Sequence, residues 1–401
     1  MKMFIPGRIE FLGKHTDYCG GRSIVCAIDR GFHADVEPRN DTMLTAESRD
    51  TGEVISFDLA TEPHFSAGHW GNYVAETARR ITRNFPDAMS RGATIRFHSD
   101  LPKAAGLSSS SALIIMSFVA LASVNGISET PIFRANLPGV VEIAEYLGCV
   151  ENGRGFRELE GTAGVGTFGG SQDHAAILLG RVDRLSAVSF GPLTVDAEFA
   201  FPADHSFVVA SSGVTAEKTG AARDRYNRVS QMVTEITASH GGTTLRGLID
   251  EIGMDALRPL ISRGQYSFSG GEMLDRVEHF YIENYEIIPA VGKLLSAGQF
   301  ENIGPLIDHS QQNAAAMLGN QVAETVFLQA AARDIGAVAA SAFGAGFGGS
   351  VYALVPSSDA ERFCGEWQRI YHTRFPQHIE LSSLFVTRPS QIELPPSFLT
   401  G

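Results

Sequence analysis

Segment 101–116 concentrates the residues that could bind an anion. It reads Leu-Pro-Lys-Ala-Ala-Gly-Leu-Ser-Ser-Ser-Ser-Ala-Leu-Ile-Ile-Met, so a loop of small residues leads through four serines into an apolar run. Gly106 lacks a Cβ atom and lets the backbone approach a ligand closely. The first N–H groups of a helix have no intrahelical acceptor, and the helix dipole adds positive charge there. The pattern favours a phosphate site, because four serines exceed what one N-cap needs, and an ordinary capped helix is the alternative.

A second group of polar side chains follows a strand-like run at 9–12. The loop after Gly13 reads Lys-His-Thr-Asp-Tyr over 14–18. Loops carried by strands often hold binding residues, because the scaffold fixes their position. The cluster indicates a site for a polar ligand or, alternatively, a solvated hairpin tip.

A third candidate is an aspartate at the start of a predicted helix. Asp173 comes after a Gly-rich, irregular stretch at 153–170 and just before the apolar run 175–179. Active-site carboxylates are often found beside such flexible loops. On the residues alone, a solvated helix cap is the simpler interpretation of Asp173.

Composition limits the class of protein. The chain has 401 residues, enough for two domains, and its 44% hydrophobic and 19% charged content is typical of a soluble globular protein. A formal net charge of −13 argues against a nucleic-acid or anionic-membrane partner. The four cysteines are scattered without metal-ligand spacing, no signal-peptide pattern opens the chain, and the apolar run 112–124 is too short to span a bilayer. We therefore expect a cytoplasmic protein with reduced thiols.

Periodicity predicts the elements that must position these residues. Helices are expected over 70–85, 112–124, 140–150, 216–239, 273–297 and 322–336. Strands are expected over 32–37, 43–48, 54–59, 93–98, 185–190, 193–199, 207–210 and 351–355. A domain boundary is expected near 190, dividing the chain into 1–190 and 191–401, with the tail at 389–396 packed on the surface.

Two familiar nucleotide motifs fail on inspection. G-x-G-x-x-G patterns occur at Gly164/Gly166/Gly169 and at Gly344/Gly346/Gly349. A dinucleotide fingerprint needs a strand before the glycines and a helix after them. The first pattern has no preceding strand, and the second follows helix-like sequence at 330–342 and precedes a strand. A P-loop over 7–15 fails too, because its glycine spacing is too long and a histidine replaces the magnesium-binding Ser or Thr.

Three separated segments together resemble the GHMP small-molecule kinases and, among them, the galactokinases. Segment 6–18, Pro-Gly-Arg-Ile-Glu-Phe-Leu-Gly-Lys-His-Thr-Asp-Tyr, resembles the galactokinase signature Gly-Arg-Val-Asn-Leu-Ile-Gly-Glu-His-Thr-Asp-Tyr. Segment 101–113 is similar to the phosphate loop of that family, and 344–350 resembles its C-terminal Gly-rich motif. Shorter likenesses occur at 70–74 and 211–214, and all follow the family order over nearly the whole chain.

The resemblance implies an α+β, two-domain GHMP kinase fold, with a ribosomal S5 domain 2-like N-terminal domain and a ferredoxin-like C-terminal domain. The active site would lie in the cleft between them. It also implies ATP- and Mg²⁺-dependent phosphorylation of the anomeric C1 hydroxyl of a galactose-type sugar. Such a reaction needs mainly positioning and charge neutralisation. The expected partners are the sugar and ATP, and the expected assembly is a monomer or a weak homodimer.

The resemblance also assigns roles by position. Asp173 matches the catalytic aspartate that accepts the C1 hydroxyl proton, and Arg8 matches the arginine that keeps it ionised and stabilises the transferring phosphoryl group. The positions expected to contact the sugar are Arg8, Lys14, His15, Asp17, Gly170, Asp173 and Tyr226.

Nucleotide and metal ligands follow from the other two motifs. The expected ATP-binding residues are Lys103, Gly106, Leu107, Ser108, Ser109, Ser110, Ser111, Gly346 and Gly348. Ser110 matches the magnesium-binding serine. Glu151 is the expected acidic metal ligand, with Glu145 as its rival. A few protein oxygens completed by water and phosphate suit Mg²⁺.

Departures from the family pattern leave the sugar open. Lys14 replaces the signature glutamate, which in the family lies near the C6 hydroxyl, so a lysine there suits galacturonate or another uronic acid. Alternatively, Lys14 points to solvent and the substrate is galactose. Phe343 also replaces a threonine, and the segment before Asp173 is longer than usual. A non-catalytic sugar and ATP sensor is the alternative of another class, which turnover of any sugar would exclude.

Overall fold

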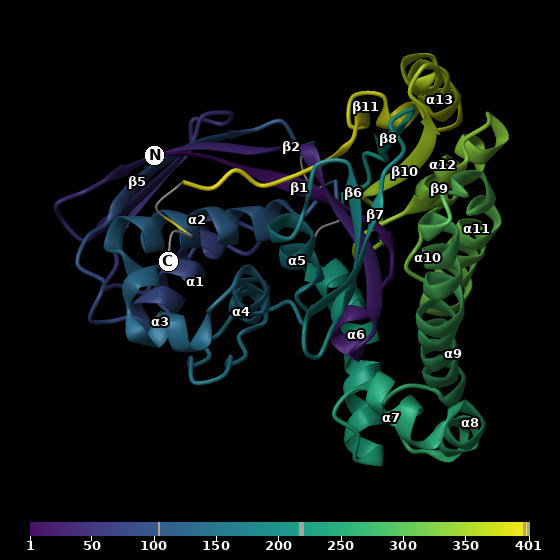
Figure 1. Cartoon of the computed structure of the whole chain (residues 1–401), viewed down its shortest axis with the longest axis horizontal. Coiled ribbons are helices and arrows are strands. Elements are labelled where there is room, and N and C mark those ends of the chain that lie inside the picture. Colours follow the sequence, from purple (N-terminus) through teal and green to yellow (C-terminus); the bar gives the residue numbers. More distant parts are fainter. Residues whose placement is uncertain (103–104, 216–219, 396–397, 399–401) are drawn as a thin grey trace.

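The computed structural model describes residues 1–102, 105–215, 220–395 and 398, without the side chains of 220–226. Within them the chain forms one eight-stranded and one four-stranded sheet, each covered by helices (Figure 1). This is the mixed α+β architecture that the sequence predicts.

The first sheet is organised around one long strand, β2 (Arg22–Pro38). The strand order is β4-β3-β5-β2-β6-β7, and β1 and β12 also pair with β2. All pairs are antiparallel except β3 with β5. The other strands are β1 (Lys2–Leu12), β3 (Met43–Ser48), β4 (Val54–Asp58), β5 (Ala93–Ser99), β6 (Arg184–Ser189), β7 (Thr194–Ala200) and β12 (Pro389–Ser390).

Helix α2 (Ser109–Asn125) forms the centre of the first core. It packs on β1, β2 and β5 and against three further helices, and most of its residues are buried. A helix that is apolar on all sides is expected to be buried in this way. Figure 1 shows the helices of this layer together beneath the sheet. They are α1 (Gly71–Asn84), α3 (Pro131–Asn136), α4 (Val140–Asn152) and α5 (Gln172–Leu178).

The second sheet is antiparallel, in the order β11-β8-β10-β9. Helices α12 (Ala323–Asp334) and α13 (Ala360–Arg374) cover it around the fully buried Trp367. Its strands are β8 (His205–Ser211), β9 (Ala339–Ala342), β10 (Ser350–Pro356) and β11 (Ser383–Thr387).

A helical region extends from the second half and packs under the loop that follows β1 (Figure 1). The single helix predicted over 273–297 is three consecutive segments, α9 (Gly270–Tyr281), a π-helical segment at Ile282–Ile287 and α10 (Ile288–Ser296). The other helices are α6 (Gly220–His240), α7 (Leu245–Ile252), α8 (Met254–Arg263) and α11 (Gly304–Asn313), which a π-helical segment at Ala314–Leu318 extends.

Three details differ from the sequence prediction. The boundary near 190 falls inside the β6–β7 hairpin of the first sheet, so we propose that the division lies after β7, near residue 200. The tail does not simply pack on the surface, because β12 pairs with β2. Strand β9 comes directly before the glycines at 344–349, where the sequence looks helical because it consists of alanines and one serine without a β-branched residue. The motif joins two strands, which still excludes a dinucleotide fingerprint.

No helix among the described residues is long and apolar enough to cross a membrane.

Candidate active site

Arg8 joins all three predicted motifs. From β1, its Nε and Nη2 both lie 2.8 Å from Asp173 Oδ1, and its Nη1 donates to the Gly106 carbonyl at 2.6 Å. Gly344 has a φ of 78°, and a Cβ atom on it would lie 3.2 Å from Arg8 Nη2 and 3.1 Å from the Gly106 oxygen, so glycine suits both the turn and this close approach. Segments far apart in the sequence therefore meet at one guanidinium group.

The carboxylate of Asp173 is placed by the first turn of α5. Negative charge is stabilised at a helix N-terminus, and the guanidinium of Arg8 adds an opposite charge at hydrogen-bond distance. The Arg8 and Asp173 side chains are only 4% and 16% exposed. The pair is thus a charge-assisted contact at the wall of a cavity rather than a solvated surface ion pair.

A small cavity beside this pair brings together most of the residues predicted to contact a sugar. Arg8, Glu10, His15, Asp17, Gly170 and Asp173 all line it. Asp17 Oδ2 accepts the backbone N–H of Gly170 at 3.0 Å. Burial raises the pKa of the Asp17 carboxyl, and bonds from backbone amides, including that of Gly170, oppose this rise. Asp17 and Asp173 therefore face a common polar cavity.

The loop that carries Asp17 is tied to the Gly-rich motif through His15. The His15 Nε2 lies 3.1 Å from the Ala345 carbonyl oxygen, and its Nδ1 lies 2.9 Å from the Tyr18 hydroxyl. Because a carbonyl oxygen only accepts, Nε2 carries the proton, and in the neutral ring Nδ1 accepts from Tyr18. His15 thus fixes the position of one wall of the cavity against the other half of the protein.

Arg276 of α9 hydrogen-bonds the loop that carries Asp17, and the sequence did not predict this role. It is 1% exposed. Its Nη2 donates to the His15 carbonyl at 2.6 Å and contacts Cys19 Sγ at 2.9 Å. An arginine within an amphipathic helical pattern gives no signal that distinguishes this role from a solvated position.

A larger cleft of about 710 Å³ adjoins the small cavity. Arg8, Asp173 and Ala345 line both spaces. The serine loop lines the cleft through Gly106, Leu107, Ser108, Ser109 and Ser110, and aromatic residues line it through Phe32, Trp70, Tyr73, Phe97 and Phe343. The cleft therefore combines a polar end at the serine loop with an aromatic lining.

The serines do not cap α2 in the ordinary way. Ser108 has a left-handed conformation, with φ of 63°, and its side chain makes no capping bond. Its Oγ is buried without a hydrogen-bond partner among the described residues. The first intrahelical bond is from Ala112 N–H to the Ser108 carbonyl, and the preceding amides of the serine loop have no acceptor within the described ranges. This geometry supports a phosphate site and not the capped-helix alternative.

Glu151, at the end of α4, lies close to the serine loop. Its carboxylate accepts from Ser111 Oγ at 3.3 Å and from Thr167 Oγ1 at 3.2 Å, and it lines the small cavity. Glu145, its rival, instead accepts the Leu193 N–H at 2.8 Å and lines neither space. The described residues hold no group of three His, Cys, Asp or Glu side chains that could bind a metal ion alone. A metal ion here would need oxygen atoms from its ligand.

Lys14 is not placed where the sequence predicts. Its Nζ donates to Ser341 Oγ at 2.7 Å and to Ser310 Oγ at 3.4 Å, and it lines neither the small cavity nor the cleft. It is 1% exposed, and burial lowers the pKa of its ammonium group. Lys14 therefore neither faces a sugar nor points to solvent.

Gly346 and Gly348 also lie outside both spaces. Cβ atoms on them would lie 2.3 Å from the Asn320 oxygen and 2.6 Å from the Val214 oxygen, so these glycines permit close packing of the loop and do not contact the cleft. Lys103 lies outside the described residues, as does the side chain of Tyr226.

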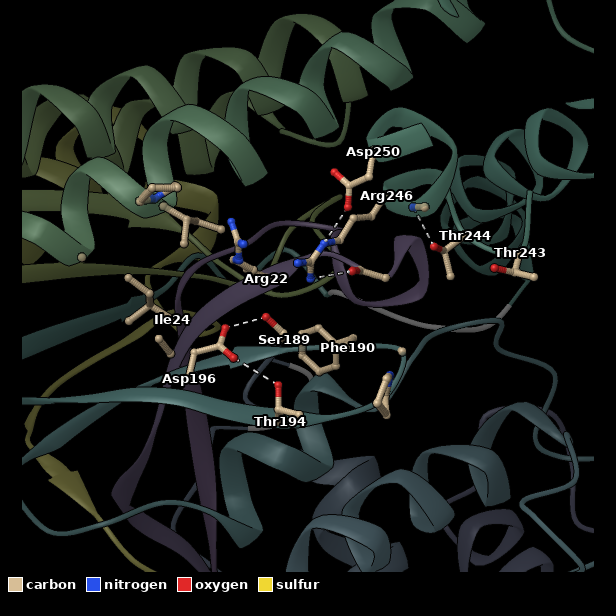
Figure 2. A pocket seen from close by; sticks show the side chains of 18 of the residues that line it. Arg22, Ile24, Ser189, Phe190, Thr194, Asp196, Thr243, Thr244, Arg246 and Asp250 are labelled. Carbon is tan, nitrogen blue, oxygen red and sulfur yellow. Dashed lines mark hydrogen bonds and ion pairs between the residues drawn. The ribbon is translucent and has the colours of Figure 1, made fainter. Parts of the chain in front are cut away.

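A third cavity of about 850 Å³ lies between the β6–β7 hairpin and helices α7 and α10 (Figure 2). Arg22 and Arg246 line it, and Arg246 Nη1 contacts the Gly20 carbonyl at 3.5 Å. None of the residues predicted to bind sugar, nucleotide or metal lines this cavity. The candidate site is thus identified by its chemistry and not by its volume.

Comparison with protein families gives three matches along the chain. Residues 3–38 match the galactokinase galactose-binding signature, 72–181 the GHMP kinases N terminal domain and 290–373 the GHMP kinases C terminal domain. The three matched regions contain Arg8, the serine loop with Asp173, and the Gly-rich motif, respectively.

Similar proteins agree with these matches. A galactokinase of Glaesserella parasuis is 27% identical over 362 residues, covering 90% of this chain and 86% of the relative. A galactokinase of Exiguobacterium sibiricum is 27% identical over 388 residues, covering 93% and 88%.

Solved structures share the fold. Galactokinase of Lactococcus lactis complexed with galactose superposes with a TM-score of 0.78 at 23% identity, covering 98% of this chain and 95% of that one. Mevalonate kinase of Methanococcus jannaschii superposes with a TM-score of 0.59 at 15% identity, covering 98% of each chain. With its motifs converging on Arg8 in a two-part α+β fold, the chain belongs to the GHMP kinases and carries the galactose-binding signature of the galactokinases.

Proposed function

We propose that this protein transfers the γ-phosphoryl group of ATP to the C1 hydroxyl of galactose or a closely related neutral hexose. The observation that carries the proposal is that Arg8 and Asp173 line both the small cavity and the cleft. A sugar in the first and a triphosphate in the second would meet at this pair. The galactokinases among its relatives and the galactose-binding signature support the same reaction.

The small cavity provides the groups that a sugar needs. Asp17 accepts hydrogen bonds and can take two adjacent hydroxyl groups, while the loop at Gly170 closes the cavity beside it. Asp173 accepts the proton of the C1 hydroxyl as the phosphoryl group arrives. Whether the proton leaves early or late, the carboxylate orients the nucleophile for in-line attack.

The cleft provides the groups that a nucleotide needs. Free amides at the start of α2 bind the phosphates, and Arg8 stabilises the charge that develops on the transferring group. The adenine base of ATP would lie against the aromatic lining of the cleft. There Trp70 stacks with His69 and meets Phe97 edge to face.

Mg²⁺ would be held by Glu151, which lines the small cavity and accepts from Ser111, and by the neighbouring Ser110, which lines the cleft. A carboxylate and a hydroxyl, completed by phosphate oxygens and water, are the ligands it prefers. When bound, Mg²⁺ neutralises phosphate charge. The chain contributes Glu151, which its bonds from Ser111 and Thr167 hold in place.

The direct test is release of ADP with Mg²⁺-ATP and a panel of galactose, galacturonate, arabinose, glucose and N-acetylgalactosamine. We expect turnover to be fastest with galactose, and phosphorus NMR to place the phosphate on C1. ATP-dependent phosphorylation at C6, or no turnover with any of these sugars, would refute the proposal. Turnover with any sugar excludes a non-catalytic sensor.

Replacing Lys14 tests the uronic-acid alternative. We expect Lys14→Met to leave the ratio of kcat/KM values for galactose and galacturonate unchanged, because the ammonium faces Ser310 and Ser341. The variant should instead lose about 1–3 kcal/mol of unfolding free energy, because the buried hydroxyl groups of Ser310 and Ser341 lose a charged donor. Lys293→Met on an exposed face of α10 is the stability control. A selective loss of galacturonate turnover would show that Lys14 reads the C6 group.

Replacing Glu151 tests the metal assignment. Residues that only hold a metal ligand in place contribute about 10–100-fold to metal affinity, so a direct ligand should contribute at least as much. We therefore expect Glu151→Gln to raise the Mg²⁺ concentration for half-maximal activity by at least about tenfold. Glu145→Gln on the same helix is the matched control and should leave the Mg²⁺ titration unchanged. A raised Mg²⁺ requirement in Glu145→Gln, with an unchanged one in Glu151→Gln, would identify Glu145 as the metal ligand instead.

A further inference from the structure

One buried acid faces the small cavity without a role in the reaction described above. Glu10 lies two residues after Arg8 on β1, and the register is regular between them, since Arg8, Ile9 and Glu10 pair with consecutive residues of β2. Alternate strand residues share a face, so Arg8 and Glu10 point to the same side. Both line the small cavity with Asp17 and Asp173.

The Glu10 carboxyl group is buried and leaves one oxygen unsatisfied within the described part of the chain. Glu10 is 2% exposed, and its Oε1 has no hydrogen-bond partner among the described residues. The nearby cations are engaged elsewhere, since Arg8 donates to Asp173 and Gly106 and Lys14 donates to two serines. A buried polar oxygen without a partner is costly, and such atoms usually mark a place where a ligand supplies the missing bond.

Burial favours the neutral form of the Glu10 carboxyl group. Burial raises its pKa to about 8, with Asp173 and Glu283 adding to the rise and Lys14 and Arg8 opposing it. At neutral pH it is largely a carboxylic acid, which offers one O–H donor and acceptor oxygens. Such a group is matched to a hydroxyl of a ligand, which also donates and accepts.

We propose that the carboxyl group of Glu10 binds a hydroxyl group of the sugar and makes Glu10 a specificity-determining residue of this site. The inference rests on the proposed function. Besides the largely neutral Glu10, three acidic side chains, Asp17, Glu151 and Asp173, line the cavity against the single guanidinium of Arg8. The cavity therefore selects an uncharged hexose and rejects a sugar carboxylate by like-charge repulsion. The family signature has asparagine at this position, so Glu10 sets this chain apart from the pattern.

The test compares Glu10→Gln and Glu10→Leu on galactose and on its 2-, 3-, 4- and 6-deoxy derivatives. The amide of Glu10→Gln keeps a donor and an acceptor and should lose much less kcat/KM than Glu10→Leu does. Glu10→Leu keeps the size and loses the hydrogen bond, and we expect kcat/KM for galactose to fall about tenfold or more. With the one deoxy sugar that lacks the bound hydroxyl, Glu10→Leu and the parent enzyme should have the same kcat/KM.

Equal losses for Glu10→Leu on all five sugars would overturn the proposal, because they indicate a structural role. The same holds for a loss in Glu10→Gln as large as that in Glu10→Leu. If Glu10→Leu does not fold, Glu10→Asn, which withdraws the polar group by one methylene, replaces it in the same panel and should show a loss confined to the sugars that carry the bound hydroxyl. Absence of turnover by the parent enzyme with every sugar would instead refute the proposed function itself.

Discussion

Asp173→Asn is expected to abolish most of the turnover while ATP still binds. The amide keeps the size of the side chain but cannot take the C1 proton or carry the negative charge that Arg8 faces at 2.8 Å. Losing a positioned general base typically lowers kcat by about 10²–10⁴-fold. Steady-state ADP release gives kcat, and calorimetry with an ATP analogue gives the nucleotide affinity.

The matched control for Asp173→Asn is Asp196→Asn. Asp196 lines the third cavity, where it accepts from Ser189 and Thr194, and its loss should leave kcat unchanged (Figure 2). Substantial activity in Asp173→Asn would mean that the proton acceptor is another group. Loss of activity in Asp196→Asn would point to the third cavity instead.

Arg8→Lys is expected to lower kcat by about 10²–10³-fold, the effect of losing one donor aimed at developing charge. A lysine keeps the charge but cannot bond Asp173 and the Gly106 carbonyl in the planar geometry that Arg8 uses. Arg8→Met should lose more, because it removes the cation that faces a mostly buried carboxylate, and its unfolding free energy should fall by about 3–5 kcal/mol. Kinetics and thermal unfolding measure the two effects separately.

The Arg8→Met/Asp173→Asn double variant shows whether the pair acts as one unit. We expect its loss of kcat to be much smaller than the product of the single losses, because each substitution removes the same interaction. Arg22→Lys in the third cavity is the control and should retain full activity. Losses that multiply would show that Arg8 and Asp173 act independently.

The resemblance to the galactokinases predicts the pair at the centre of the site, because the motifs that carry it are short and local. The residues alone indicate an anion site around Gly106 but favour a helix cap for Asp173, and the fold brings both segments to Arg8. Predicted strands and helices also agree closely where periodicity is strong, as in α1, α4 and β5. Short strands without β-branched residues, such as β9, give no such signal.

Side-chain direction in the loop after β1 could not be predicted. Gly13 has a φ of 107°, and a Cβ there would lie 2.3 Å from Ser23 Oγ, so the chain turns in a way that only glycine permits. The next residue, Lys14, consequently points toward Ser310 and Ser341, more than 290 positions away in the sequence. The roles of Glu10 and Arg276 likewise depend on long-range packing, which residue type and spacing do not encode.

The account stands on a sugar and a triphosphate meeting at Arg8 and Asp173. A crystal structure with galactose and a non-hydrolysable ATP analogue tests this most directly. We expect the C1 hydroxyl within hydrogen-bond distance of the Asp173 carboxylate, and the γ-phosphate between Arg8 and the amides at the start of α2. Galactose bound between Arg22 and Arg246, or a nucleotide remote from the serine loop, would contradict the account.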